Sequence, residues 1–275
     1  MASWAEAPIV VPLDGREGSV RAVPVAGRIA RRLGNEIRVV SVVANLADRE
    51  SRTKWLVDVA SEHLGDDEFT TAVAVATNPS TEIADLAGPG DLVCMATAGS
   101  VRFHSGHWGS VAEEVASALR RPMLMVGPKV DRDPGQPTQR VIAPMDGSHH
   151  AEAAAVPAAE LAAVLEVPLW LVEVVSPGAQ AAEAAHHSGV VAGLEERYVA
   201  ELQHRLAIVA DIEMHHTVIQ SENPHRAISE FVGDDGTAVM STHGRSGLTR
   251  VFAGSVTAGV VSQSRRAVVV IRPDS

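Results

Sequence analysis

Two glycine-containing segments of the sequence have the residue types that bind a phosphate group. In the second half of the chain, Ser241-Thr242-His243-Gly244 is followed nine residues later by Gly254-Ser255-Val256-Thr257. An apolar run at residues 237–240 precedes the first tetrapeptide and an apolar-periodic run follows the second, which predicts a strand, a glycine loop and a helix start. The N–H groups of such a loop and of a helix N-terminus bind anions. We therefore expect Gly244 and Gly254 to approach a phosphate with dihedrals closed to other residues, and Ser255 to be the helix N-cap.

The same arrangement occurs once more, in the first half of the chain. Ala96-Thr97-Ala98-Gly99 is followed nine residues later by Gly109-Ser110-Val111-Ala112, again after an apolar run and before a helical pattern. One glycine pair is a weak signal, because glycines occur in many turns. Two copies with identical spacing are a much stronger one.

The duplication extends over nearly the whole chain. Residues 8–15 read PIVVPLDG and residues 140–147 read RVIAPMDG, so the Pro, Asp and Gly recur at an offset of 132. The glycine loops are offset by 145, so the second copy has gained 13 residues, which we assign to a long surface loop at 176–193. Such a repeat decides for two domains. We predict a first domain at 1–128, a linker at 129–139 and a second domain at 140–275.

Strands and helices alternate in both copies. In the first copy, short apolar runs predict strands at 8–13, 36–43, 69–76, 91–96 and 123–126, and periodic segments predict helices at 18–33, 52–64, 80–86 and 109–119. These βαβ units predict an α/β fold of two tandem doubly wound open sheets, each with five mostly parallel strands and about four helices. The last strands, 123–126 and 267–271, lie at a predicted sheet edge. We expect them to pair and to join the halves as an intramolecular pseudo-dimer.

The composition excludes several classes of protein. A hydrophobic content of 46% with 21% charged residues is ordinary for a globular protein. The net charge of −11 argues against a nucleic-acid partner, because binding to a phosphate backbone requires a basic surface. No segment reaches the roughly 18 apolar residues of a membrane span, and no signal-peptide pattern opens the chain. The single cysteine, Cys94, suits a reducing compartment. We expect a cytoplasmic protein that has no membrane partner.

The conspicuous residues of the second copy follow its first and fourth predicted strands. In a doubly wound sheet these two strand ends lie side by side, and ligands bind in the crevice beyond them. Asp146-Gly147 follows the first strand, and the Ser241–Gly244 loop follows the fourth. A carboxylate can accept a hydrogen bond from a ribose hydroxyl or a base amine, while backbone amides bind phosphates. This combination suits a nucleotide.

The arrangement resembles the universal stress protein family in its tandem form, over nearly all of both halves. Members of that family carry a Gly-x-x-Gly, nine-residue, Gly-Ser/Thr pattern, and those that bind ATP use it for the ribose and phosphates. The resemblance implies that an aspartate and a valine contact the adenosine and that the loop holds the phosphates, which Mg²⁺ would accompany. The implied site residues are Asp146, Val174, Ser241, Gly244, Gly254, Ser255, Val256 and Thr257 in the second copy, and Asp14, Val42, Gly99, Gly109, Ser110 and Val111 in the first.

The sequence departs from the family pattern in both copies. The first glycine is Ser241 in the second copy and Ala96 in the first. The first copy also has Ala112 where the second has Thr257, and Glu113-Glu114 then adds negative charge to the first helical turn. The loop of the first copy holds the bulky residues Phe103, His104, His107 and Trp108. The loop of the second copy holds Arg245 and Arg250. We therefore predict that the second copy is the better nucleotide site.

Other interpretations stay open. The glycine loops could be structural turns inherited by the duplication, and Asp14 and Asp146 could be turn or capping residues. No Walker motif, dinucleotide fingerprint or Gly-x-Ser-x-Gly motif occurs, and the histidine pairs lack zinc spacing. We expect an ATP-binding stress-response regulatory protein with little or no hydrolysis, which forms a homodimer and acts on an unidentified protein partner. The alternatives are a structural or interaction protein of the same fold without a nucleotide, and a slow adenine-nucleotide hydrolase.

Overall fold

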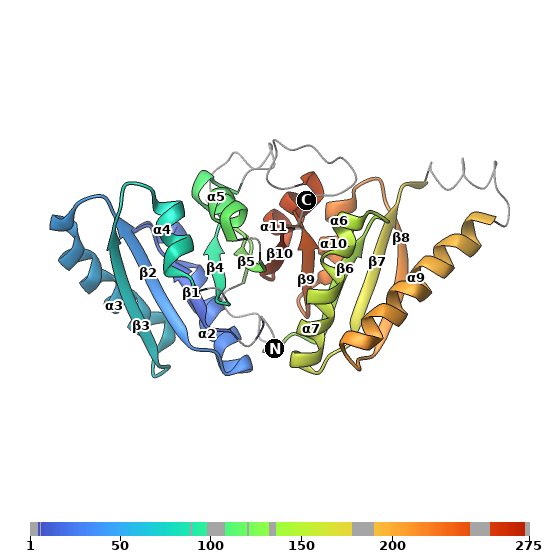
Figure 1. The fold of residues 1–275 in the computed structure, drawn as a ribbon, viewed down its shortest axis with the longest axis horizontal. Helices are drawn as coiled ribbons and strands as arrows, with labels where there is room; N and C mark the ends of the chain where they lie inside the picture. Colours follow the sequence, from blue (N-terminus) through green and yellow to red (C-terminus); the bar gives the residue numbers. More distant parts are fainter. Residues whose placement is uncertain are drawn as a thin grey trace.

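The computed structural model describes residues 5, 7–88, 90–97, 108–119, 121–131, 136–177, 190–242 and 254–272, without the side chains of 190–199. Within these residues ten strands form a single sheet in the order β3-β2-β1-β4-β5-β10-β9-β6-β7-β8 (Figure 1). The first half runs 3-2-1-4-5 along the sheet, and the second half repeats that order in reverse. The strands are β1 Ile9–Pro12, β2 Ile37–Val43, β3 Phe69–Val75, β4 Leu92–Ala96, β5 Met123–Val126, β6 Arg140–Met145, β7 Leu169–Val175, β8 Met214–Gln220, β9 Gly236–Ser241 and β10 Val268–Ile271. The predicted α/β architecture of two tandem, doubly wound halves is confirmed.

Helices cover both faces of the sheet, and each face has its own cluster of buried side chains. One cluster includes residues of α2, α3, α7 and α9, and the other includes residues of α4, α5, α10 and α11. Ile9 and Val11 belong to the first cluster, whereas Val10 between them belongs to the second. Because both faces are buried, inner strands such as β1 and β10 read as continuous apolar runs, whereas the outer strands β3 and β8 are partly exposed and include polar residues. The helices are α1 Glu17–Val20, α2 Ala22–Leu33, η2 Leu46–Asp48, α3 Arg49–Leu64, α4 Pro79–Leu86, α5 Ser110–Leu119, α6 His149–Glu152, α7 Ala155–Leu165, α9 Val190–Val209, α10 Pro224–Val232 and α11 Ser255–Gln263.

The two halves are joined through their last strands, as predicted. β5 and β10 pair antiparallel, with Leu124 opposite Val269, whereas all other neighbouring strands of the described sheet pair in parallel. The pair lies at the centre of the sheet, with β3 and β8 at its outer ends (Figure 1). Two apolar edges therefore cover each other within one chain.

The helix that follows the first strand differs from its prediction in each half. A single helix is expected at 18–33, but the structure divides it into α1 and α2 around Arg21. Pro24 has no N–H group to donate to the carbonyl of Val20, so the helical ladder is interrupted there. In the second half Pro157 has the same relation to Ala153, and α6 and α7 are divided there.

The predicted loop at 176–193 is shorter than expected. α9 begins at Val190, so the last four residues of that range are helical. Residues 178–189 lie outside the described residues. Because α9 has 20 residues and α3 has 16, part of the additional length of the second half lies in a longer helix.

Candidate functional site

Asp146 and Ser241 lie at the carboxyl ends of neighbouring strands. β6 pairs in parallel with β9, as the first and fourth strands of a doubly wound sheet should. β6 also pairs with β7, and the register of Met145 opposite Glu173 puts Val174 at the level of Asp146. The structure thus brings together three of the residues that the resemblance implied.

The N-terminus of α11 adjoins this strand end. Gly254 is the N-cap residue and Ser255 is the first helical residue, so the prediction of Ser255 as N-cap is wrong. The φ of Gly254 is −57° and its ψ is 146°, which any residue adopts, so the prediction of glycine-only dihedrals is also wrong at this position. The N–H of Gly254 donates to the carbonyl of Thr242 and so connects the helix start to the end of β9. Gly244 lies outside the described residues.

Three amides at the start of α11 point out of the helix toward its N-terminus. The first intrahelical bond runs from the N–H of Ala258 to the carbonyl of Gly254. The N–H groups of Ser255, Val256 and Thr257 therefore precede the helical ladder. Together with the positive end of the helix dipole, they form an arrangement that favours an anion. The side chain of Ser255 is exposed, and that of Val256 is half-buried.

The hydroxyl of Thr257 has a partner inside the protein. Its Oγ1 donates to the carbonyl oxygen of Ser241 at 2.7 Å, and both residues are buried. The resemblance implies a hydroxyl donor for the phosphates at Thr257, but the structure uses this hydroxyl to fasten α11 to β9. Among the two hydroxyls at the start of α11, the exposed one belongs to Ser255.

Asp146 organises the turn between β6 and α6. Its Oδ1 accepts from the backbone N–H of Ser148 at 3.0 Å and from the Ser148 hydroxyl at 2.6 Å. The Ser148 oxygen in turn accepts from the N–H of Ala151 and caps α6. In the first half, Oδ1 of Asp14 likewise accepts from the N–H of Arg16 at 2.9 Å. Both aspartates thus stabilise a turn, as the alternative interpretation of Asp14 and Asp146 as turn residues predicts. A contact of Asp146 with adenosine stays a prediction.

Each half of the chain matches the model of one protein family. The universal stress protein family is matched at residues 7–127 and again at 137–272. The chain belongs to the universal stress protein family. It carries the family's domain twice, in the tandem form that the repeat predicted.

Solved structures with the same fold include other universal stress proteins. One from Archaeoglobus fulgidus DSM 4304 has a TM-score of 0.67 at 18% identity, over 99% of this chain and 98% of that chain. A functionally unknown protein from Pseudomonas aeruginosa PAO1 has a TM-score of 0.58 at 14% identity, over 98% and 93%. A putative universal stress protein from Pseudomonas aeruginosa UCBPP-PA14 has a TM-score of 0.56 at 15% identity, over 98% and 94%. At these identities the likeness concerns the fold alone. Comparison with curated proteins finds no match.

The first half of this universal stress protein has a different helix start. Gly109 has a φ of 113°, in the left-handed region that favours glycine. Oε1 of Glu113 accepts from the N–H of Trp108 at 2.8 Å, so a carboxylate of the protein already lies at the start of α5. Ser110, the first residue of α5, is exposed. The indole of Trp108 is fully buried.

Val42 and Val111 of the first half lie at the positions that match Val174 and Val256 of the second. Val42 is half-buried near the end of β2, level with Asp14 in the register of β1 and β2. Val111 is half-buried in the first turn of α5. Gly99 lies outside the described residues, as do three of the four bulky loop residues, Phe103, His104 and His107.

Arg52 is a residue that the sequence analysis missed. Its Nη1 donates to the hydroxyl of Ser41 at 3.2 Å, and its guanidinium lies 5.1 Å from the ring centre of Trp55. A Cβ placed on Gly15 would overlap this guanidinium, so the turn after β1 is covered by a cation. Arg52 recurs as Arg197 at the 145-residue offset. That repetition was the signal available in the sequence.

The described residues contain no group of three or more His, Cys, Asp or Glu side chains placed to hold a metal ion. His215 instead stacks on Trp170, with ring centres 4.4 Å apart, and its Nε2 lies 3.1 Å from a carboxylate oxygen of Glu213. None of the described helices combines the length and the apolar character that crossing a bilayer requires.

Proposed function

We propose that the second half of this universal stress protein binds ATP, with the phosphates at the N-terminus of α11 and the nucleoside toward Asp146 and Val174. The observation that carries the proposal is the set of three amides, of Ser255, Val256 and Thr257, that precede the first intrahelical bond at the carboxyl edge of the sheet. Mg²⁺ would enter with the phosphates, since it binds nucleotides mainly through phosphate oxygens and water.

The difference between the two halves supports the choice of the second. At the position of Glu113, whose carboxylate lies at the start of α5, the second half has Ala258. A carboxylate there satisfies the helix dipole and repels a polyphosphate, whereas alanine does neither. We therefore propose that the first half binds nucleotide weakly or not at all.

The proposed role is regulatory, with little or no hydrolysis. The sequence holds no Walker motif, and it shows no general base or water-positioning group that would direct water at a phosphate anhydride. A homodimer and a protein partner remain predictions. The apolar edges that could have joined two chains, β5 and β10, already pair within one chain.

A matched pair of variants tests the proposed site. Ser255 and Ser110 are both exposed first residues of their helices, so Ser255→Glu and Ser110→Glu make the same change in the two halves. A glutamate in the first turn favours the helix dipole, so neither change should unfold the protein. We expect the ATP dissociation constant, measured by isothermal titration calorimetry with Mg²⁺ present, to rise at least tenfold in Ser255→Glu and to stay unchanged in Ser110→Glu.

The alternatives predict different results. A structural protein of the same fold would give the same weak ATP binding in wild type and in both variants, and that outcome would remove the nucleotide proposal. A hydrolase would release phosphate from excess ATP at a rate that Ser255→Glu abolishes. Mass spectrometry of small molecules released from the denatured protein would identify which nucleotide is bound.

A further inference from the structure

A cavity of about 450 Å³ lies where the two halves meet. Its lining includes Leu92, the first residue of β4, and Thr237, the second residue of β9. The cavity is therefore at the amino ends of these strands, at the opposite end from the candidate nucleotide site. Its volume falls within the roughly 300–1,000 Å³ that is typical of small-molecule pockets.

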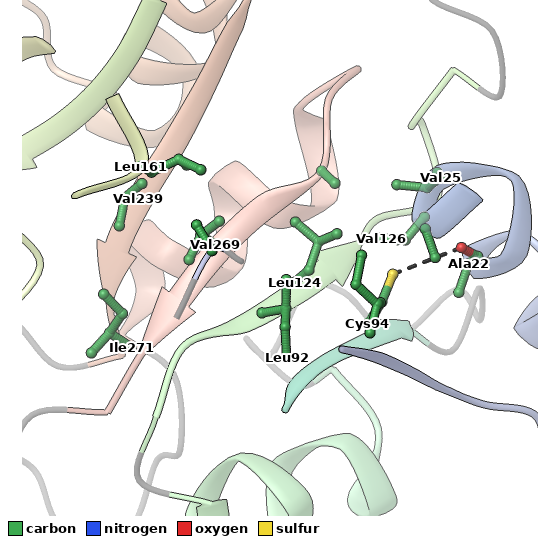
Figure 2. Packing of buried hydrophobic residues seen from close by; sticks show 14 of the residues in the cluster. Ala22, Val25, Leu92, Cys94, Leu124, Val126, Leu161, Val239, Val269 and Ile271 are labelled. Carbon is green, nitrogen blue, oxygen red and sulfur yellow. Dashed lines mark hydrogen bonds between the residues drawn. The ribbon is translucent and has the colours of Figure 1, made fainter. Parts of the chain in front are cut away.

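One side of the cavity is apolar and is built from both halves. Leu92 and Leu124 come from β4 and β5, Val269 comes from β10, and Leu161 comes from α7. Figure 2 shows Leu124 and Val269 side by side where β5 meets β10, with Leu161 approaching on the side of Val269. An apolar ligand group would be shielded from water here.

The other side of the cavity holds Arg266, an arginine that is only 7% exposed. Its Nη1 donates to the carbonyl of Gln136 at 2.9 Å and its Nη2 donates to the hydroxyl of Thr138 at 2.8 Å. Both acceptors are neutral. Within the described part of the chain, no carboxylate lies within 4.0 Å of this guanidinium. A buried cation without a close counter-ion is costly, because burial removes its hydration.

A second arginine, Arg28 of α2, lines the same cavity and acts on the first. Burial and the charge of Arg28 lower the pKa of the Arg266 guanidinium from its ordinary value, against the opposing charges of Asp235 and Asp234. Arg31 and Arg32 line the same space, so four of the described arginines surround it. The binding of an anion beside Arg266 would compensate for the hydration that burial removes from its guanidinium.

We propose that this cavity binds an organic anion with an apolar body, of the class of alkyl carboxylates, whose carboxylate faces Arg28 and Arg266 and whose body lies against Leu92, Leu124 and Val269. The pocket has the composition of a ligand site: mostly apolar walls with a few convergent charged groups. Because its lining comes from both halves, an occupied cavity would also hold the two halves together.

Isothermal titration calorimetry of the full chain with three probes tests this site. Octanoate carries both the charge and the apolar body, 1-octanol carries the body alone, and acetate carries the charge with almost no body. We expect octanoate to bind at least tenfold more tightly than either of the other two. Binding of octanoate no tighter than that of octanol or acetate would overturn the proposal.

Variants locate the binding. Because Arg266 is buried and its replacement could unfold the protein, the charge is tested with Arg28→Gln on a half-buried residue of α2. Ile29→Trp fills the cavity from the same helix. We expect each to weaken octanoate binding at least fivefold. The control is Arg226→Gln, which removes an exposed arginine of α10 that is paired with Glu230 and should leave the affinity unchanged. Octanoate binding that survives both cavity variants would refute the site.

The site is independent of the nucleotide proposal. Ser255→Glu changes the opposite end of the strands, so octanoate should bind this variant as it binds the wild type. Loss of octanoate binding in Ser255→Glu would contradict the assignment to the cavity. Failure of ATP to bind the wild type would leave the octanoate result unaffected.

Discussion

The hydroxyl of Thr257 donates a hydrogen bond of 2.7 Å to the carbonyl oxygen of Ser241. This bond fastens the first turn of α11 to the last residue of β9, so the direction of the helix amides is set by the fold before any ligand arrives. The first half has Ala112 at the position of Thr257 and cannot make the bond. The duplicated loops therefore differ in how their helices are held.

Replacing Thr257 with valine should destabilise the protein. Thr257→Val keeps the shape of the side chain but removes the hydrogen bond to the buried carbonyl of Ser241, which costs about 0.5–1.5 kcal/mol. Thr257→Ser retains the hydroxyl and should lose less stability. Urea denaturation followed by circular dichroism measures the free energy of unfolding of both variants. Equal stability of Thr257→Val and wild type would show that the bond does not support α11.

Glu166 and Gly34 are equivalent C-cap residues of the two halves, and both have a left-handed backbone conformation. They lie 132 residues apart in the repeat, at the C-caps of α7 and α2, and both have positive φ, 55° for Glu166 and 74° for Gly34. A left-handed conformation costs a residue with a Cβ roughly 1–2 kcal/mol, whereas glycine adopts it freely. Glu166→Gly should therefore stabilise the protein by about 1 kcal/mol.

The reverse change at Gly34 is the control. A Cβ there would meet no atom within 4 Å, so Gly34→Ala tests the backbone strain alone and should destabilise by about 1 kcal/mol. Thermal unfolding measures both variants. If the melting temperature falls in Glu166→Gly, its C-cap is held by interactions of the Glu166 side chain.

The buried thiol of Cys94 should make stability fall at alkaline pH. Burial raises the pKa of the Cys94 thiol far above its usual value, against the opposing charge of Arg28. In the unfolded chain the thiol loses its proton above about pH 8.5. Because the pKa of this thiol is higher in the folded state than in the unfolded chain, its contribution to the free energy of unfolding is complete below about pH 8.5. Above that pH the contribution is lost as the pH rises, by about 1.4 kcal/mol per pH unit.

The measurement compares unfolding free energies of wild type and Cys94→Ala between about pH 8 and pH 10, across the unfolded thiol's pKa. Other titrating groups affect both proteins equally, so the wild-type curve should fall more steeply than that of the variant. Parallel curves would show that Cys94 is solvated in the folded state.

The sequence predicts the fold well because the repeat and the apolar runs report on local structure. β5 has the predicted bounds, 123–126, and its pairing with β10 was expected from two apolar edges, whereas the antiparallel direction of that pairing is a finding of the structure. The breaks around Arg21 and Ala153 were missed, although Pro24 and Pro157 stand in the sequence, because the periodic apolar pattern continues across both prolines.

The side-chain contacts around the two sites could not be predicted from sequence patterns, because they depend on how the elements pack in space. Arg52 covers Gly15 only once α3 packs beside the end of β1, and no periodicity encodes that approach. Arg28 and Arg266 are separated by most of the sequence and share a cavity only after β5 and β10 pair. The hydroxyl of Thr257 was expected to face a ligand, and only the folded geometry shows that it reaches Ser241.

The pairing of β5 with β10, which joins the two halves, should make the energetic effects of substitutions at Leu124 and Val269 depend on each other. These residues are opposite each other in the β5–β10 pair, and each is 2% exposed. In a double-mutant cycle, Leu124→Ala alone should lower the free energy of unfolding by about 2–5 kcal/mol. The variant that combines Leu124→Ala with Val269→Ala should depart from the sum of the two single costs by about 0.5–3 kcal/mol, because the two residues are in contact. The control pairs Leu124→Ala with Leu56→Ala on α3, a buried residue over the outer strands, where the costs should add. Urea denaturation supplies the free energies. Additive costs for Leu124 and Val269 would mean that each half contributes its stability alone, and that the pairing of β5 with β10 joins the halves without stabilising either.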